Sequence, residues 1–112
     1  MEQKNMEKIE TLVKRWGIPL QLIMTMEECA ELSVVCSKLL RTEVKREKLV
    51  DALADMYVML QTVAGIYGVT GEELETVAGN KLDIGLAKPY PEESNAEETA
   101  SQEPAKEETA GD

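Results

Sequence analysis

The stretch from Leu49 to Val69 constrains the fold most, because it holds 21 residues whose only charged side chains are Asp51 and Asp55. Carboxylates inside an apolar segment are costly unless they are paired or bind a cation. The stretch is long enough to cross a membrane, but two aspartates near one end and several interior polar residues and glycines argue against that interpretation. We therefore expect a helix packed inside a protein, with acids that bind a metal ion.

The N-terminal half of the chain predicts two helices. Apolar residues between positions 3 and 16 fall three and four apart, which is typical of an amphipathic helix, and Gly17 is expected to end it. Pro19 suits the first turn of a second helix, which we expect over about 20–40. Its apolar residues nearly encircle the axis, so it should be buried on more than one side.

Two further helices are expected after a polar connection at 41–45. The third runs to Tyr67, with one apolar stripe along its length. Thr70-Gly71-Glu72-Glu73 has the form of a capping box, which predicts a fourth helix over about 71–86. Nothing in 1–88 alternates like a strand, so the sequence predicts an all-α domain.

The last 24 residues differ from this domain. Residues 89–112 hold three prolines and eight acids against Lys106 alone, a net charge of −7, so residues 1–88 carry −3 of the total of −10. We expect 89–112 to be a disordered acidic tail. A chain this acidic has no basic stripe for duplex nucleic acid and is repelled by anionic membranes.

Histidine is absent, and the two cysteines lie seven apart on one expected helix. The first fact excludes histidine-based catalysis and imidazole metal sites. The second places Cys29 and Cys36 too far apart for a disulfide, so we expect reduced core thiols. With a polar N-terminus that lacks the apolar core of a signal peptide, this favours the cytoplasm.

Two pairs of acids have compatible positions. Glu28 and Glu31 are three apart on the second expected helix, and Asp51 and Asp55 are four apart on the third. If the chain turns near Glu43, Glu31 and Asp55 are each about a dozen residues from the turn and reach the same level of an antiparallel helical hairpin. Four carboxylates then converge between two helices.

An all-oxygen set of ligands selects hard cations, Mg²⁺ first and Mn²⁺ second. Magnesium shared with phosphate oxygens suggests hydrolysis of a phosphoanhydride by in-line attack of water. Glu27 is a candidate base or outer ligand. The competing interpretation is that each acid forms an ordinary surface pair with a nearby lysine or arginine.

These motifs resemble a known family. Glu27-Glu28-Cys29-Ala30-Glu31, a spacer, and then Ala52-Leu53-Ala54-Asp55 are similar to the signature of the MazG-like all-α nucleotide pyrophosphohydrolases, which include MazG, dimeric dUTPases and dCTP pyrophosphatases. The signature there is Glu-Glu-x-x-Glu followed by Glu-x-x-Asp. The resemblance covers most of residues 5–88 and extends to Trp16-Gly17, Gln21, Lys38 through Arg41, and Asn80-Lys81-Leu82.

The resemblance implies a function and roles for single residues. The family hydrolyses nucleoside triphosphates to the monophosphate and pyrophosphate, and Glu28, Glu31 and Asp55 match its metal ligands. Ala52 stands where the family has a further glutamate, so a ligand is missing. Asp51, its neighbour, is the candidate replacement. Without one, the alternative is an impaired or non-catalytic nucleotide-binding or interaction protein of the same fold.

Four further residues are candidates for substrate contact by the same resemblance. Lys38 and Lys81 fall where family members place basic residues near the phosphates, and Trp16 and Gln21 are positioned to hold the base. The competing interpretations are solvated lysines and a tryptophan packed in the core. A redox di-iron bundle is disfavoured because such sites recruit histidine.

The two central helices carry more apolar surface than the two shorter, more polar outer helices cover. A second copy of the chain is the simplest cover. We therefore expect a homo-oligomer, dimer or tetramer, that takes a nucleoside triphosphate as its substrate.

Overall fold

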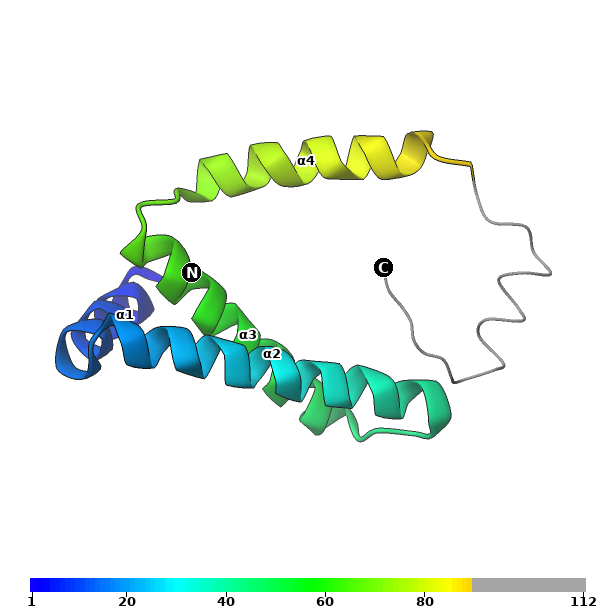
Figure 1. Ribbon diagram of the computed structural model, residues 1–112, viewed down its shortest axis with the longest axis horizontal. Helices are drawn as coiled ribbons and strands as arrows, with labels where there is room; N and C mark the ends of the chain where they lie inside the picture. Colours follow the sequence, from blue (N-terminus) through cyan, green and yellow to red (C-terminus); the bar gives the residue numbers. More distant parts are fainter. Residues whose placement is uncertain (90–112) are drawn as a thin grey trace.

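The computed structural model describes residues 1–89, which form four helices and contain no strand (Figure 1). This confirms the all-α prediction for the part of the chain described. The helices are α1 (Gln3–Trp16), α2 (Ile18–Arg41), α3 (Arg46–Ile66) and α4 (Gly71–Ala87). The tail predicted to be disordered lies, from residue 90 onward, outside the described residues.

Gly17 forms the corner between α1 and α2. Its φ of 87° is accessible mainly to glycine, and its N–H donates to the carbonyl of Val13 at 2.8 Å, which ends α1 as predicted. Pro19 follows in the first turn of α2, where its missing N–H costs no helical hydrogen bond. Ile9 is the buried residue of α1 and marks the side of that helix that faces the other helices.

The main packing contact of the described chain lies between α2 and α3, which are joined by residues 42–45. The buried residues Gln21 and Val35 of α2 and Met59 of α3 mark the facing sides. The hydroxyl of Thr25 donates to the carbonyl of Gln21 at 2.8 Å and also lies 3.4 Å from the sulfur of Met59. This contact fixes the level at which the two helices meet.

The corner between α3 and α4 is built from two consecutive capping motifs. Gly68, at φ 69°, donates to the carbonyl of Gly65, and Val69 donates to that of Ala64 at 2.8 Å, which is the Schellman pattern. The hydroxyl of Thr70 then accepts from the N–H of Glu73, whose carboxylate accepts from the N–H of Thr70 at 3.0 Å. The predicted capping box is therefore confirmed.

Helix α4 extends away from the other three (Figure 1). Within residues 1–89 it makes no substantial packing contact with α1, α2 or α3. None of its residues is buried. The buried apolar side chains of the described chain are few, and α4 contributes none of them; they are Ile9, Val35, Ala52 and Met59.

Two expectations about which residues are buried are wrong, because the single chain leaves much of its apolar surface uncovered. Cys29 and Cys36 are free, as predicted, but both are exposed, so placing them in the core was wrong. Trp16 is 46% exposed and is not a core residue of this chain either. For the cysteines, the apolar circumference of α2 requires neighbours on several sides, and the single chain supplies them on one.

Helix α3 is also long and apolar enough, by length and composition, to cross a membrane. Its most apolar 18-residue window has a mean hydropathy of 1.4, and 17% of that window is buried. The core helix of a soluble protein passes the same test, so this is weak evidence for a membrane span.

Candidate functional site

Two acids interrupt the faces through which α2 and α3 pack. On α2, Glu28 follows Thr25 by three residues on the side that faces α3. On α3, Asp55 lies between the buried residues Ala52 and Met59 on the side that faces α2. Both residues are intermediate in exposure. The helix contact therefore places one acid from each helix at the same level.

The electrostatics of Glu28 reflect this arrangement. Its pKa is raised above the ordinary value of 4.5, first by loss of solvation at the helix contact. The charge of Asp55 and a side-chain hydrogen bond to Asp55 raise the pKa further, followed by the charges of Glu31 and Glu27. A carboxylate with this many acidic neighbours favours binding of a proton or a cation.

The other acids of the predicted constellation lie at the edges. Glu27 and Glu31 are exposed and line a surface hollow together with Glu28. Asp51 is exposed and lines a different hollow, with Arg46 and Glu47 among its neighbours. The structure thus brings Glu28 to Asp55 and keeps Glu31 beside them, but it does not place Asp51 in the same hollow.

Within residues 1–89, the acid pair lacks both a third ligand close enough to complete a metal site and a basic partner. No three acidic or cysteine side chains there converge closely enough to hold a metal ion as a set. The ion pair found in that part of the chain joins Lys4 to Glu2, far along the sequence from the acid pair, so neither Glu28 nor Asp55 has a lysine or arginine partner there. The pair is short of positive charge and offers two carboxylates to a cation.

The residues suggested for substrate contact are dispersed. Lys38 is exposed near the C-terminal end of α2, and Lys81 is exposed on the separate α4. Trp16 is at the end of α1. Gln21 is 2% exposed, and its amide nitrogen has no hydrogen-bond partner in the described chain. In this structure the Gln21 amide therefore faces other side chains of the protein and no open surface.

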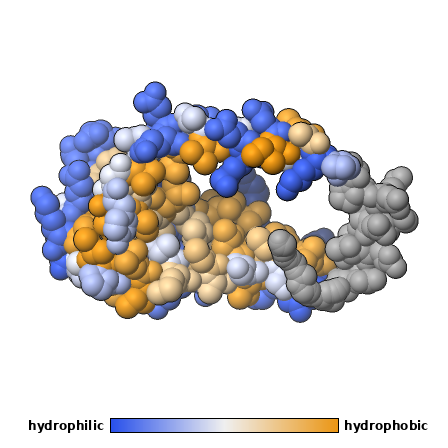
Figure 2. Space-filling view, turned by 45° about the horizontal axis from the view of Figure 1, so that its top comes forward, coloured by the Kyte–Doolittle hydropathy of each residue, from blue (hydrophilic) through white to orange (hydrophobic). Residues whose placement is uncertain are grey.

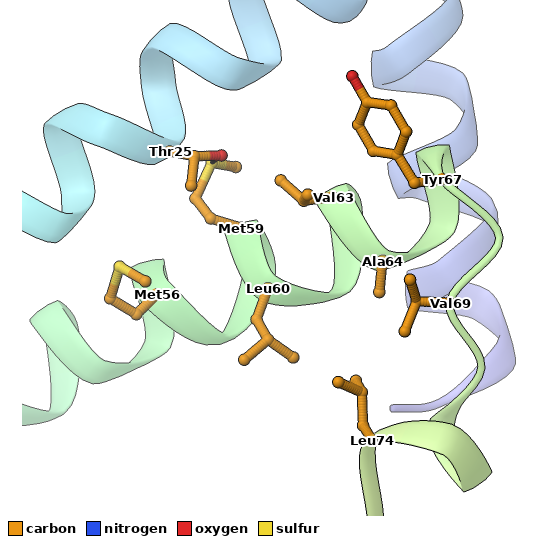
Figure 3. A pocket seen from close by; sticks show the side chains of 9 residues that line it. All are labelled: Thr25, Met56, Met59, Leu60, Val63, Ala64, Tyr67, Val69 and Leu74. Carbon is orange, nitrogen blue, oxygen red and sulfur yellow. Dashed lines mark hydrogen bonds between the residues drawn. The ribbon is translucent and has the colours of Figure 1, made fainter. Parts of the chain in front are cut away.

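One feature near the acid pair was missed by sequence reasoning. An apolar cavity of about 300 Å³ opens between α2, α3 and the start of α4 (Figure 3). Its wall is mostly α3, with Thr25 from α2 and Val69 and Leu74 from beyond the Schellman corner. The α3 residues are Met56, Met59, Leu60, Val63, Ala64 and Tyr67. The apolar stripe of the third helix was visible in the sequence, but the direction in which α4 leaves the corner, and with it the uncovered part of the stripe, was not.

No protein-family model matches the chain, and no curated protein or solved structure matches it.

Proposed function

We propose that the chain is a Mg²⁺-dependent nucleotide pyrophosphohydrolase, which converts a nucleoside triphosphate to the monophosphate and pyrophosphate. The observation that carries the proposal is the pair Glu28 and Asp55, one acid from each of two packed helices, at one level and without a basic partner in residues 1–89. Like charges so close together repel unless a proton or a cation lies between them. A hard divalent cation suits two carboxylates, and magnesium keeps further positions for water and phosphate oxygens.

The residues suit a cation that is shared with the substrate phosphates better than one enclosed entirely by protein ligands. Glu28 and Asp55 would hold it directly, and Glu31, which borders the same hollow as Glu28, would add a third carboxylate through a rotation of its exposed side chain. When bound, Mg²⁺ supplies charge neutralisation at the phosphates and makes a coordinated water more acidic. The chain itself orients the substrate and accepts the proton of the attacking water, for which Glu27 is the exposed candidate.

Membership of the MazG-like superfamily belongs to the same proposal. It is supported by Glu27-Glu28-Cys29-Ala30-Glu31 on α2 and by Asp55 on α3, since the opposed positions of Glu28 and Asp55 are what an antiparallel MazG-like hairpin needs. The proposal includes a homo-oligomer in the cytoplasm. Lys38 and Lys81 are proposed to approach the phosphates, and Trp16 and Gln21 the base, only after rearrangement or assembly.

Ala52 favours a second candidate. It is 7% exposed, on the side of α3 that faces α2, so the position where the family carries a glutamate holds a methyl group. Asp51, one residue earlier, is exposed in another hollow. A protein that binds nucleotides without hydrolysing them is therefore the alternative function.

The test is pyrophosphate release from a panel of ribo- and deoxynucleoside triphosphates with Mg²⁺ and with Mn²⁺. Glu28→Gln and Asp55→Asn should each lower turnover by at least about 100-fold, because each removes a direct ligand. Glu75→Gln, on the exposed surface of α4, is the matched control and should leave turnover unchanged. Undiminished Mg²⁺-dependent turnover in both site variants would contradict the metal assignment. Thermal stabilisation by nucleotide without turnover would support the second candidate.

A further inference from the structure

The connection between α2 and α3 concentrates positive charge in an otherwise acidic chain. Residues 38–48 carry five basic and two acidic side chains, a net charge of +3, whereas the rest of residues 1–88 carries −6. All five basic side chains are exposed, and we call them the basic tip. They are Lys38, Arg41, Lys45, Arg46 and Lys48. A local excess of positive charge at the surface attracts anionic groups.

Contacts within the described chain compensate only part of this charge. Lys38 and Arg41 lie in the last turn of α2, where the helix dipole favours cations. Lys45 is the N-cap of α3, and Arg46 and Lys48 lie in its first turn, where the positive end of the dipole disfavours cations. Lys45 makes no side-chain capping bond, and no residue of the basic tip forms an ion pair within residues 1–89. The charge at the start of α3 therefore lacks an anionic partner in that part of the chain.

The basic tip lies toward the same end of the molecule as the end of α4. In Figure 1, the last turn of α4 and the connection between α2 and α3 are both at the right-hand end of the long axis. The chain continues from Lys88 into residues 89–112, which carry a net charge of −7. These 24 residues span at most about 80 Å, and the longest dimension of the structure is 50 Å. The acidic segment is therefore long enough to reach the basic tip.

The apolar surface is the competing place for this segment to bind. Figure 2 shows hydrophobic residues across the body of the molecule, and the cavity between α2, α3 and the start of α4 is lined by uncharged side chains. Residues 89–112 hold eight acids, with Tyr90 as their one large hydrophobic side chain. Carboxylates placed against an apolar wall lose solvation without gaining a partner. Charge therefore favours the basic tip over the cavity.

We propose that the acidic segment 89–112 binds across the basic tip of its own chain and keeps other polyanions away from it. Six of the seven glutamates of the segment occur as adjacent pairs, so different pairs can meet the cations without one fixed register. A partner on the same chain has a high effective concentration, which favours it over a separate acidic protein or a nucleic acid. Those partners must also approach against the net charge of −10. Exposed ion pairs are screened by salt, so the contact weakens as the ionic strength rises.

The first experiment locates the segment by paramagnetic relaxation in NMR spectra of the full chain. In a background of Cys29→Ser and Cys36→Ser, a chain with Ala110→Cys carries a nitroxide spin label at that position. At low salt, the amide signals of residues 38–48 should lose at least about half of their intensity relative to the reduced label, while those of α1 keep theirs, because a contact within one chain is populated most of the time. At about 1 M salt, where the Debye length is about 3 Å, the signals should recover. No selective loss at low salt, or a loss that salt leaves unchanged, would overturn the proposal.

A matched pair of variants tests whether the basic tip is the partner of the segment. Lys45→Gln with Lys48→Gln removes two charges from the tip and should reduce the signal loss at least about two-fold. Lys8→Gln with Lys14→Gln removes the same charge from the exposed surface of α1 and should leave the loss unchanged. Equal effects of the two double variants would show that net charge alone governs the segment, and the proposal would fail.

A mixture of spin-labelled chains with unlabelled, isotope-enriched chains separates binding within one chain from binding between copies. The enriched chains should keep their signals at residues 38–48. A loss there as large as within the labelled chain would assign the contact to a second copy and overturn the proposal. No nucleotide is present in these experiments, so their outcome does not depend on whether the chain hydrolyses nucleotides.

Discussion

The α2–α3 pair and α4 are stabilised by different kinds of interaction. The pair is held by side-chain packing, with Met59 5% exposed and in contact with Thr25, whereas α4 is defined by local motifs at its start and has no buried residue. A helix of this length is marginal without tertiary contacts. The α2–α3 pair therefore depends on tertiary contacts, whereas α4 has little beyond its local motifs to stabilise it within residues 1–89.

The largest expected contrast between the two regions is in the free energy of unfolding. Met59→Ala should lower it by about 2–4 kcal/mol, because it leaves a cavity between α2 and α3. Leu86→Ala, at a position 84% exposed on α4, should change it by less than about 0.5 kcal/mol in dilute solution. Urea unfolding followed by circular dichroism measures both. Equal losses in dilute solution would show that α4 belongs to the same core.

The next test introduces a carboxylate at Ala52, the position where the proposed metal site lacks a ligand. Ala52→Glu should cost about 1–3 kcal/mol without divalent cations, since it adds a third acid between the helices beside Glu28 and Asp55. Mg²⁺ should recover part of that loss by binding the folded chain. Ala54→Glu, at an exposed position of the same helix, is the control. Equal rescue of both variants by Mg²⁺ would count against a metal site at this level.

The fold was largely predictable because its helix boundaries are set by interactions among a few neighbouring residues. Gly17 ends α1, Pro19 lies in the first turn of α2, and the box at Thr70 opens α4, all as the sequence predicted. Such signals act over a few residues, so they do not need the rest of the molecule. A turn near Glu43 predicts Glu31 at the level of Asp55, whereas in the structure Glu28, three residues earlier on α2, is the acid that lies against Asp55.

Features that depend on neighbours were not predictable in the same way. Cys29 and Trp16 are apolar or weakly polar residues, yet both are exposed, because burial requires a partner surface that periodicity does not supply. Asp51 and Asp55 are four apart, but Asp51 lies in a different hollow. A helical turn of 3.6 residues rotates such a pair enough to separate them at the edge of a contact.

Glycine-to-alanine substitutions at the corner before α4 and inside α4 should have a smaller effect on the free energy of unfolding. Gly68→Ala should destabilise α4 by about 1–2 kcal/mol, because alanine is strained at φ 69° although its Cβ would meet no atom within 4 Å. Gly79→Ala, inside α4, should stabilise that helix by about 1 kcal/mol. Amide hydrogen exchange should show both changes in α4 and neither in α2. Changes of equal size in α2 would mean that the regions unfold together.

The smallest expected effect concerns the acid pair and its pH dependence. Because the pKa of Glu28 is raised in the folded chain, this group contributes most to stability below its unfolded pKa, and the contribution is lost as the pH rises through the folded pKa. Glu28→Gln removes the charge that Asp55 repels, so without divalent cations its Tm should exceed that of the wild type at neutral pH, with the difference shrinking toward pH 4. Glu10→Gln, on the exposed surface of α1, should show no such trend. Mg²⁺ at neutral pH should raise the Tm of the wild type and leave Glu28→Gln unchanged, because the proton and the cation relieve the same repulsion. A Tm difference between Glu28→Gln and wild type that is independent of both pH and Mg²⁺ would show that the two carboxylates do not act as a pair.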